Sequence, residues 1–427
     1  MLKKISRFKF TSVMALFLIL LLFSGTLLAE EFYETKDFDL EGETVTIHFS
    51  HDVLSGQHGP PHVPERVEAA EEKFNVNIET KVVPIEEKME SRANRLMAGD
   101  SEYDIWRIDN VNLWSMVAED MILPISEYVP ESYYENLPQI PRKSHKYNEI
   151  NGVKYTFSNR PDIENHAVIA FNKDIYDKTN LENPQKLYEK GEWTWDTFEK
   201  HAIELTQDTS GDGEIDQWGI AFTNPYWWVM ANGGNLTKVK EDGSRSFGMN
   251  EPQALTALEK LQEWHDVEGI VGGDFEEGTA AMTEFWVFTL ELESNIDNYG
   301  LVPYPQGPDV EENKYPADSV SSYVLPMNSA EPEAMVAIMS YLMPNQLYGA
   351  RNQSLINRAP DRKSAQILEE IDDQWDGSEQ LGAFYIGEPV WDSIFEEVLT
   401  GEQSPNAVMD ALEPEANALL EELYWEE

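Results

Sequence analysis

Residues 44–83 of this chain read TVTIHFSHDVLSGQHGPPHVPERVEAAEEKFNVNIETKVV, and their apolar pattern predicts the fold class. Residues 44–49 and residues 76–83 alternate between apolar and polar side chains, which is typical of half-buried strands. Between them, residues 67–74 carry apolar side chains at helical spacing. The stretch therefore predicts a strand, a helix and a second strand in succession.

The following residues repeat this order. Residues 89–96 predict another helix, which Gly99 ends, and residues 103–106 predict a short strand. A chain that alternates strands with helices forms a parallel sheet with right-handed crossover connections. We therefore expect an α/β protein.

Further core helices are predicted wherever apolar residues recur at helical spacing, namely over residues 198–205, 255–264, 335–342 and 408–419. Ser329 is the expected N-cap of the helix that contains residues 335–342. The sequence contains no internal repeat and no long linker. A chain of this length without a linker is typical of two lobes that exchange strands.

The composition is strongly acidic. The chain has 427 residues, with 79 Asp and Glu against 31 Lys and Arg, and its formal net charge is −48. This charge disfavours nucleic acid and anionic membranes as partners, because few cations are available to neutralise phosphates. Hydrophobic residues make up 41%, which is enough for sizeable cores. Since the chain has no cysteine, disulfides, thiol catalysis and Cys-ligated metal sites are excluded.

Residues 1–29 are typical of an export signal. Four basic residues among the first nine precede an apolar run over residues 13–23, and cleavage is expected after Ala29. The alternative is an uncleaved anchor. Cleavage removes four basic side chains and no acidic one, which takes the net charge from −48 to −52. Because molar salt shortens the Debye length to about 3 Å and screens the resulting self-repulsion, the charge predicts a high-salt habitat. A calcium-loaded or merely acidic secreted protein is the alternative.

Residues 208–216, Asp-Thr-Ser-Gly-Asp-Gly-Glu-Ile-Asp, match the front of an EF-hand-type calcium loop. The expected oxygen ligands are the side chains of Asp208, Ser210, Asp212 and Asp216 and the backbone carbonyl of Glu214. The bidentate glutamate that usually ends such a loop is replaced by Gly219. A structural calcium ion is one interpretation, and a polar turn between a helix and a strand is the other.

Histidine and tryptophan supply the other candidate binding groups. His48, His51, His58 and His62 cluster within fifteen residues and could hold zinc, although their spacing matches no closed tetrahedral site. Many of the 12 tryptophans lie in polar, loop-like contexts, where a ring can stack on the C–H face of a sugar. The segment 226–228, Tyr-Trp-Trp, is the best candidate, because adjacent rings are not expected to face one core.

Motifs of catalysis are missing. The sequence contains no G-x-S-x-G, H-E-x-x-H, Walker A or G-x-G-x-x-G. With 79 acidic residues, a carboxylate pair for glycoside hydrolysis cannot be selected. We therefore predict that the protein is not an enzyme.

The order of short motifs resembles that of the family 1 extracellular solute-binding proteins of ABC importers, the maltose-binding-protein-like group. The matching stretches are residues 74–78, 96–106, 151–155, 169–174, 193–198, 275–282, 299–303 and 305–308. The resemblance implies two α/β lobes of the periplasmic-binding-protein fold (type II-like), with parallel-dominated sheets, flanking helices and a ligand cleft between the lobes. It divides the chain into a signal peptide (1–29), an N-lobe (30–157), a C-lobe (158–300), an N-lobe return segment (301–327), and C-lobe with C-terminal helices (328–427).

The resemblance also implies ligand-binding positions on both sides of the cleft. These are His51, Asp52, Asp109, Asn110, Trp114, Arg160, Asn224, Tyr226, Trp227, Trp228, Trp286, Tyr323 and Trp391. Trp286 follows its motif after a shorter gap than in maltose binders, which leaves the direction of its ring open.

The function implied is that of an exported receptor that captures a carbohydrate, such as an oligosaccharide, and delivers it to the permease subunits of an ABC importer. We expect a monomer in the periplasm or outside the cell, which needs no cofactor and has no cysteine for a lipid anchor. Two alternatives remain open. One is a metal-capture receptor that uses the cluster from His48 to His62, and the other is a secreted carbohydrate-active enzyme.

Overall fold

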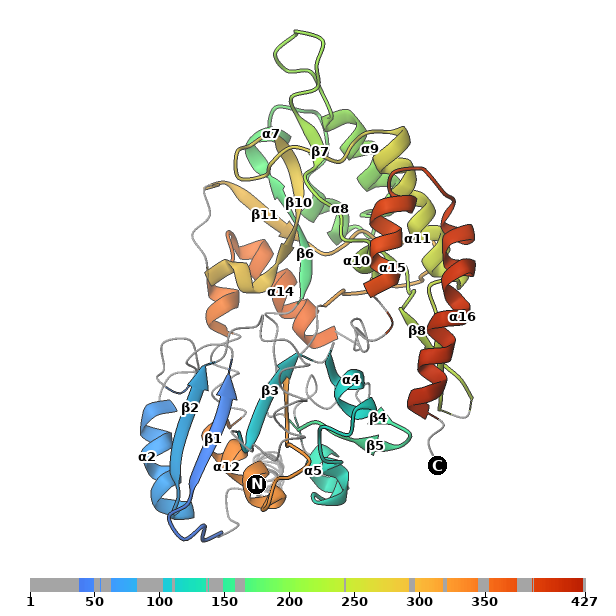
Figure 1. Cartoon of the computed structure of the whole chain (residues 1–427). Helices are drawn as coiled ribbons and strands as arrows, with labels where there is room; N and C mark the ends of the chain where they lie inside the picture. Colours follow the sequence, from blue (N-terminus) through green and yellow to red (C-terminus); the bar gives the residue numbers. More distant parts are fainter. Residues whose placement is uncertain are drawn as a thin grey trace, which may run out of the picture.

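The structure is a computed structural model of the chain. It describes residues 38–49, 54, 63–82, 103–109, 112–135, 137, 149–157, 166–241, 243–291, 296–317, 321–344, 353–374, 386 and 388–424. Two lobes, each built on a four-stranded sheet, lie one above the other (Figure 1). The predicted signal segment and the helix predicted over residues 89–96 lie outside the described residues.

The N-lobe contains the sheet with strand order β12-β3-β1-β2. Its elements are β1 (Thr44–Phe49), α2 (Val63–Phe74), β2 (Asn77–Val82), β3 (Ile105–Asp109), α4 (Leu113–Ala118), the 3-10 helix η2 (Ile125–Glu127), α5 (Glu131–Glu135), β4 (Glu149–Ile150), β5 (Val153–Lys154), β12 (Ser321–Val324) and α12 (Pro332–Leu342). Strand β1 pairs in parallel with β2 and β3, as the succession of predicted strands and helices indicates, and β12 pairs with β3 in the antiparallel direction.

The C-lobe contains the sheet with strand order β11-β6-β10-β7. Its elements, with the C-terminal helices, are β6 (Ala167–Asn172), α7 (Lys173–Tyr176), α8 (Pro184–Glu189), α9 (Trp195–Leu205), β7 (Trp218–Ile220), α10 (Pro225–Ala231), β8 (Thr237–Val239), β9 (Arg245–Phe247), α11 (Pro252–Gln262), the π-helix η4 (Glu263–Val267), β10 (Ala280–Trp286), the 3-10 helix η5 (Val287–Glu291), β11 (Tyr299–Val302), α14 (Arg362–Gln374), α15 (Glu388–Ser393), the π-helix η6 (Ile394–Val398) and α16 (Pro405–Tyr424). Strand β6 pairs antiparallel with β10 and β11, so this sheet is mixed and not dominated by parallel pairs.

The chain returns to the N-lobe later than predicted. Strand β11 belongs to the C-lobe sheet, although residues 301–327 were expected to lie in the N-lobe, and β12 is the strand that joins the N-lobe sheet. Helix α12 packs with α2 in the N-lobe core, whereas residues 328–427 were expected in the C-lobe. The backbone hydrogen bonds between Phe157 and Tyr323, both 2.9 Å, hold the outgoing and returning segments together.

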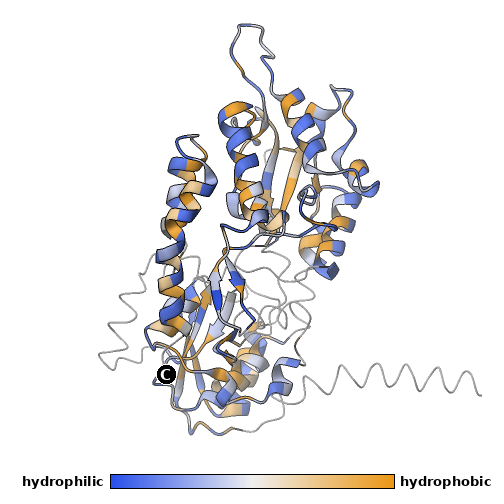
Figure 2. Ribbon diagram, turned by 90° about the vertical axis from the view of Figure 1, so that its right-hand side faces the viewer, coloured by the Kyte–Doolittle hydropathy of each residue, from blue (hydrophilic) through white to orange (hydrophobic). Residues whose placement is uncertain are grey.

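Strand β6 of the C-lobe sheet is buried along its whole length, whereas β2 of the N-lobe sheet is mostly polar. The helices around the sheets carry both hydrophobic and hydrophilic residues (Figure 2). One hydrophobic core contains residues of β1, α2 and α12, and lies within the N-lobe. The largest core lies in the C-lobe but also includes Trp114 and Met116 of α4 in the N-lobe. Helix α16 contacts α4 as well as α11 and β9, so it links the two lobes (Figure 1).

Within the residues that the structure describes, none of the helices is both long enough and apolar enough to cross a membrane.

Candidate functional site

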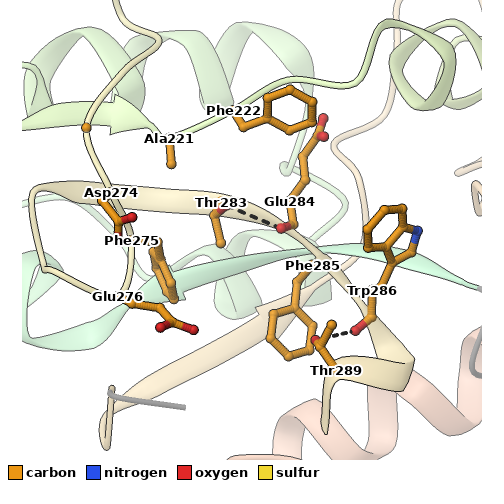
Figure 3. A pocket seen from close by; sticks show the side chains of 11 residues that line it. Ala221, Phe222, Asp274, Phe275, Glu276, Thr283, Glu284, Phe285, Trp286 and Thr289 are labelled. Atoms are coloured by element: carbon orange, nitrogen blue, oxygen red, sulfur yellow. Dashed lines mark hydrogen bonds between the residues drawn. The ribbon is translucent and has the colours of Figure 1, made fainter. Parts of the chain in front are cut away.

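A pocket of about 410 Å³ opens in the C-lobe beside the C-terminal half of β10 (Figure 3). Its described lining consists of Ala221, Phe222, Gly273, Asp274, Phe275, Glu276, Thr283, Glu284, Phe285, Trp286 and Thr289. Four of these residues are aromatic and three carry carboxyl groups. Strand β10 ends at the side of the C-lobe that is nearer the N-lobe (Figure 1).

The pocket forms where two neighbouring strands differ in length. Strand β7 ends at Ile220, which pairs with Met282, while β10 continues to Trp286. The Ala221 N–H still donates to the Met282 carbonyl at 2.9 Å, and beyond this bond the edge of β10 lines the pocket. Threonine hydroxyls cap two carbonyls of this region: Thr283 donates to the Glu284 carbonyl, and Thr289 to the Trp286 carbonyl (Figure 3).

The opposite wall is a tight turn that requires glycine. Gly273 has a φ of +73°, and a Cβ there would lie 2.8 Å from both the Thr279 carbonyl oxygen and the Trp218 ring. The Asp274 carboxylate accepts the Glu277 N–H at 2.9 Å, which closes the turn. This turn brings Phe275 and Glu276 to the pocket.

Among the three carboxyl groups of the pocket, that of Glu284 accepts hydrogen bonds from helix α10 and its N-cap. Its two oxygens accept the Asn224 N–H at 2.8 and 2.7 Å, and Oε1 also accepts the Trp228 indole N–H at 2.7 Å. Burial raises the pKa of Glu284 to about 8, because the interactions with Asn224, Tyr304 and Trp228 offset only part of the cost of removing a charge from water. The group therefore titrates near neutral pH.

Helix α10 contributes three aromatic rings, and each of them packs on a different neighbour. Trp227 meets Trp286 edge to face, with ring centroids 5.0 Å apart. Trp228 packs against Trp264 at 4.8 Å, and Tyr226 against Trp391 at 5.4 Å. The three rings were expected to face different environments, and the structure shows all three buried, because core elements surround α10 on every side.

Six of the predicted ligand-binding residues come together in this part of the C-lobe. They are Asn224, Tyr226, Trp227, Trp228, Trp286 and Trp391. Among them Trp286 lines the pocket itself, and Asn224 is the N-cap of α10, where its side chain accepts the Tyr226 N–H at 3.1 Å. Trp227 packs against Trp286, the Trp228 indole N–H donates to Glu284, and Tyr226 packs against Trp391.

Two predicted residues lie in hydrophobic cores away from the pocket. Trp114 is fully buried in α4, and the Arg245 guanidinium lies 5.6 Å from its ring centroid. Tyr323 is buried in the N-lobe, where it packs against Phe49 and Phe157. Neither Trp114 nor Tyr323 lines the pocket beside β10.

The remaining predicted contacts, His51, Asp52, Asn110 and Arg160, lie outside the described residues, as does the side chain of Asp109, whose backbone ends β3. Three histidines of the predicted zinc cluster are outside them as well. The fourth, His48, is buried in β1 with its ring edge-on to Tyr103 at 5.3 Å.

The acidic loop over residues 208–216 organises itself through its own backbone. The Asp208 carboxylate accepts N–H groups from Gly211 at 2.6 Å and Gly213 at 2.7 Å, and Asp216 accepts that of Ser210 at 2.9 Å. These backbone hydrogen bonds lower the pKa of both carboxyl groups. The loop projects from the end of the C-lobe that is remote from the N-lobe (Figure 1).

Over the described ranges, the structure contains no group of three or more His, Asp or Glu side chains arranged to hold a metal ion. Calcium binding by the loop over residues 208–216 stays a prediction.

Sequence reasoning missed Phe222 and Glu284. Phe222 is 50% exposed, an unusual state for a large apolar side chain, and it lines the pocket. Glu284 interrupts the apolar run of β10 two residues before Trp286, so both side chains leave the same face of the strand (Figure 3). A carboxyl group at that position of a buried strand is a signal that the sequence already contains.

The sequence matches a known protein family. Residues 65–377 match the family model of the bacterial extracellular solute-binding protein. A comparison with curated protein sequences gives no match.

Solved structures share the fold over most of the chain. One is an ABC substrate-binding protein from Listeria monocytogenes in complex with cycloalternan, with 15% identity, 88% of this chain and 98% of that chain covered, and a TM-score of 0.63. A cyclic alpha-maltosyl-1,6-maltose binding protein from Arthrobacter globiformis has 15% identity, the same two coverages of 88% and 98%, and a TM-score of 0.65. An extracellular solute-binding protein from Staphylococcus aureus in complex with maltose has 14% identity, coverages of 89% and 98%, and a TM-score of 0.64.

At such identities the solved structures establish the two-lobe fold, and the family follows from the sequence match. This chain belongs to the bacterial extracellular solute-binding proteins.

Proposed function

We propose that this protein captures an oligosaccharide and delivers it to the permease subunits of an ABC importer. The observation that carries the proposal is the pocket beside β10, in which aromatic rings alternate with carboxyl and hydroxyl groups. A pyranose has apolar C–H faces and a rim of hydroxyls, so it needs rings on which to stack and polar groups that accept its O–H donors. The family is one of binding proteins, which favours capture over catalysis.

Two of the structures with the same fold hold cycloalternan and maltose, which supports the choice of carbohydrate as the ligand class. The ring assigned to stacking in this chain is that of Trp286, with Trp227 packed behind it. The half-exposed Phe222 is the second apolar surface of the pocket.

Calorimetry with a panel of neutral mono-, di- and oligosaccharides tests the proposal. We expect at least one oligosaccharide to bind, and we expect Trp286→Ala to weaken its binding by about tenfold or more, since loss of a stacking partner costs about 1.4 kcal/mol. Phe395→Ala is the matched control, because Phe395 is an exposed ring on η6 that does not line the pocket. Flat titrations across the whole panel would overturn the carbohydrate assignment.

The proposal includes export to the periplasm or the cell exterior as a monomer, without a cysteine-linked lipid. The high negative charge supports an environment rich in salt. N-terminal sequencing of the secreted protein and sedimentation in molar salt test these points. A mature chain that starts at residue 30 and sediments as one copy is expected, and a chain retained with its leader in the membrane fraction would contradict the expectation.

A further inference from the structure

Glu284 links strand β10 to a turn and a helix that lie 56 to 60 residues earlier in the sequence. It lies on β10, which also carries Trp286. Its carboxylate accepts the N–H of Asn224, the N-cap of α10, and the indole N–H of Trp228 within α10. One side chain therefore fixes the strand, the turn and the helix relative to one another.

Glu284 holds a turn of the pocket that lies beyond the end of β7, where β7 no longer pairs with β10. Residues 221–224 run from the end of β7 to α10 and carry Phe222, which is half-exposed at the pocket. Besides the bond from Asn224 to Glu284, the turn is held by Thr223, whose hydroxyl lies 2.7 Å from the His265 Nε2 of η4. The position of Phe222 thus depends on hydrogen bonds made by Thr223 and Asn224, the two residues that follow it.

We propose that Glu284 is the positioning residue of the ligand pocket, and that its ionised form holds the Phe222 turn and helix α10 in the arrangement that binds ligand. This inference rests on the proposed function, because the ligand that it concerns is the oligosaccharide.

The chemistry of the carboxyl group supports the proposal. An ionised carboxylate is an acceptor only, which suits two N–H donors, whereas a protonated carboxyl group turns one oxygen into an O–H donor. Since both oxygens of Glu284 contact the Asn224 N–H, protonation places a donor against a donor and weakens the bond. Burial raises the pKa of Glu284 to about 8, so this change falls near neutral pH.

The groups that face Glu284 are mostly neutral. From α10 they are the Asn224 N–H and the Trp228 indole, and Ile169 of β6 lies opposite on the neighbouring strand. Tyr304, which follows β11, interacts with Glu284: it lowers the pKa of Glu284, and burial and Glu284 raise the pKa of Tyr304.

Two further carboxyl groups, Asp274 and Glu276, line the same pocket from the glycine turn. His265 faces the turn through Thr223, and burial lowers its pKa. Among the described lining residues there is no Lys or Arg. Near pH 8, therefore, Glu284 is the group whose titration alters the turn.

The affinity of the wild-type protein should rise about tenfold between pH 7 and pH 9, because the ionised fraction of a group with a pKa of about 8 rises from about a tenth to about nine-tenths. Glu284→Gln imitates the protonated form, so it should bind weakly and with no pH dependence. Glu204→Gln, an exposed carboxyl group on α9 outside the pocket, is the control and should keep the wild-type profile. A merely structural role for Glu284 would lower affinity without flattening the profile.

The experiment has a second arm that uses no ligand and no variant. The Trp228 indole N–H resonance of the wild-type protein should shift with pH, with a midpoint near that of the affinity profile, because its acceptor changes charge. An indole resonance that is constant from pH 6 to pH 9 would overturn the inference. Binding of an oligosaccharide with the same affinity at pH 7 and pH 9 would also overturn it while leaving the proposed function intact. An indole that titrates in a protein that binds no sugar would instead overturn the proposed function and the ligand role of Glu284, but not the link between Glu284 and α10.

Discussion

Replacing Glu284 by glutamine should change how the stability of the protein depends on pH. The ordinary pKa of a glutamate is 4.5, and burial raises that of folded Glu284 to about 8. A group whose pKa is raised by folding contributes stability that is fully present below the unfolded pKa and is lost as the pH rises through the folded pKa. Each pH unit in this interval is equivalent to about 1.4 kcal/mol. Relative to the glutamine variant, the wild-type protein should therefore lose about 2 kcal/mol between pH 6 and pH 8, and little more above pH 9.

Urea unfolding at pH 6, 7, 8 and 9 in molar sodium chloride measures this difference. The salt screens the remaining carboxylates, and subtraction of the variant from the wild type removes their common contribution. Glu204→Gln should follow the wild-type curve at every pH. If the free energies of unfolding of wild type and Glu284→Gln differ by the same amount at pH 6 and pH 8, Glu284 does not titrate as a buried group, and the reasoning from its surroundings fails.

Three further predictions concern packing, charge and metal binding. Phe198→Ala should lower the free energy of unfolding by about 3–5 kcal/mol, because Phe198 is fully buried between Trp228 and Trp264, whereas the exposed Phe395→Ala should have almost no effect in the same urea titration. The melting temperature should rise as sodium chloride is increased from 0.05 M to molar concentration, because the net charge of −48 opposes a compact state in dilute buffer, and a melting temperature independent of salt would contradict this. Calcium should raise the melting temperature and a chelator reverse the rise, in wild type but not in Asp208→Asn; equal melting temperatures with calcium and with chelator would leave the loop as a hydrogen-bonded turn.

The elements with one buried face could be predicted from the sequence alone. Strand β1 coincides with the predicted residues 44–49, and the stripe over residues 198–205 lies within α9. In both cases burial on one side imposes a local period, and a local period is visible in one sequence.

Helix starts were less predictable. Ser329 was expected to cap α12, but the helix begins at Pro332 with Glu331 as the N-cap, and no side chain caps it. Proline has no N–H to satisfy and has a φ suited to the first helical position, which explains a start later than the serine.

The pocket could not be predicted from the sequence alone, because it is formed by contacts between residues that are far apart in the chain. The partners of Glu284 on α10 are 56 and 60 residues away from it, so their hydrogen bonds follow from the fold and not from spacing. The same holds for the rings of α10, whose burial on every side results from the packing of elements such as β10, α11 and α15. The resemblance named Asn224 and Trp286 as expected ligand contacts, and the structure brings both close to Glu284, but the resemblance did not identify that carboxyl group.

The core shared by α4 and the C-terminal helix bears on folding cooperativity. Trp114 and Met116 of the N-lobe belong to the same hydrophobic core as Leu420 and Leu423 of α16, so neither lobe can expose its part of this core without exposing that of the other. A chain divided into independent lobes would melt in two steps at two temperatures. This one should lose both lobes in a single calorimetric transition. A truncation before residue 405, which removes α16 and its contacts with both lobes, should lower the temperature of that transition.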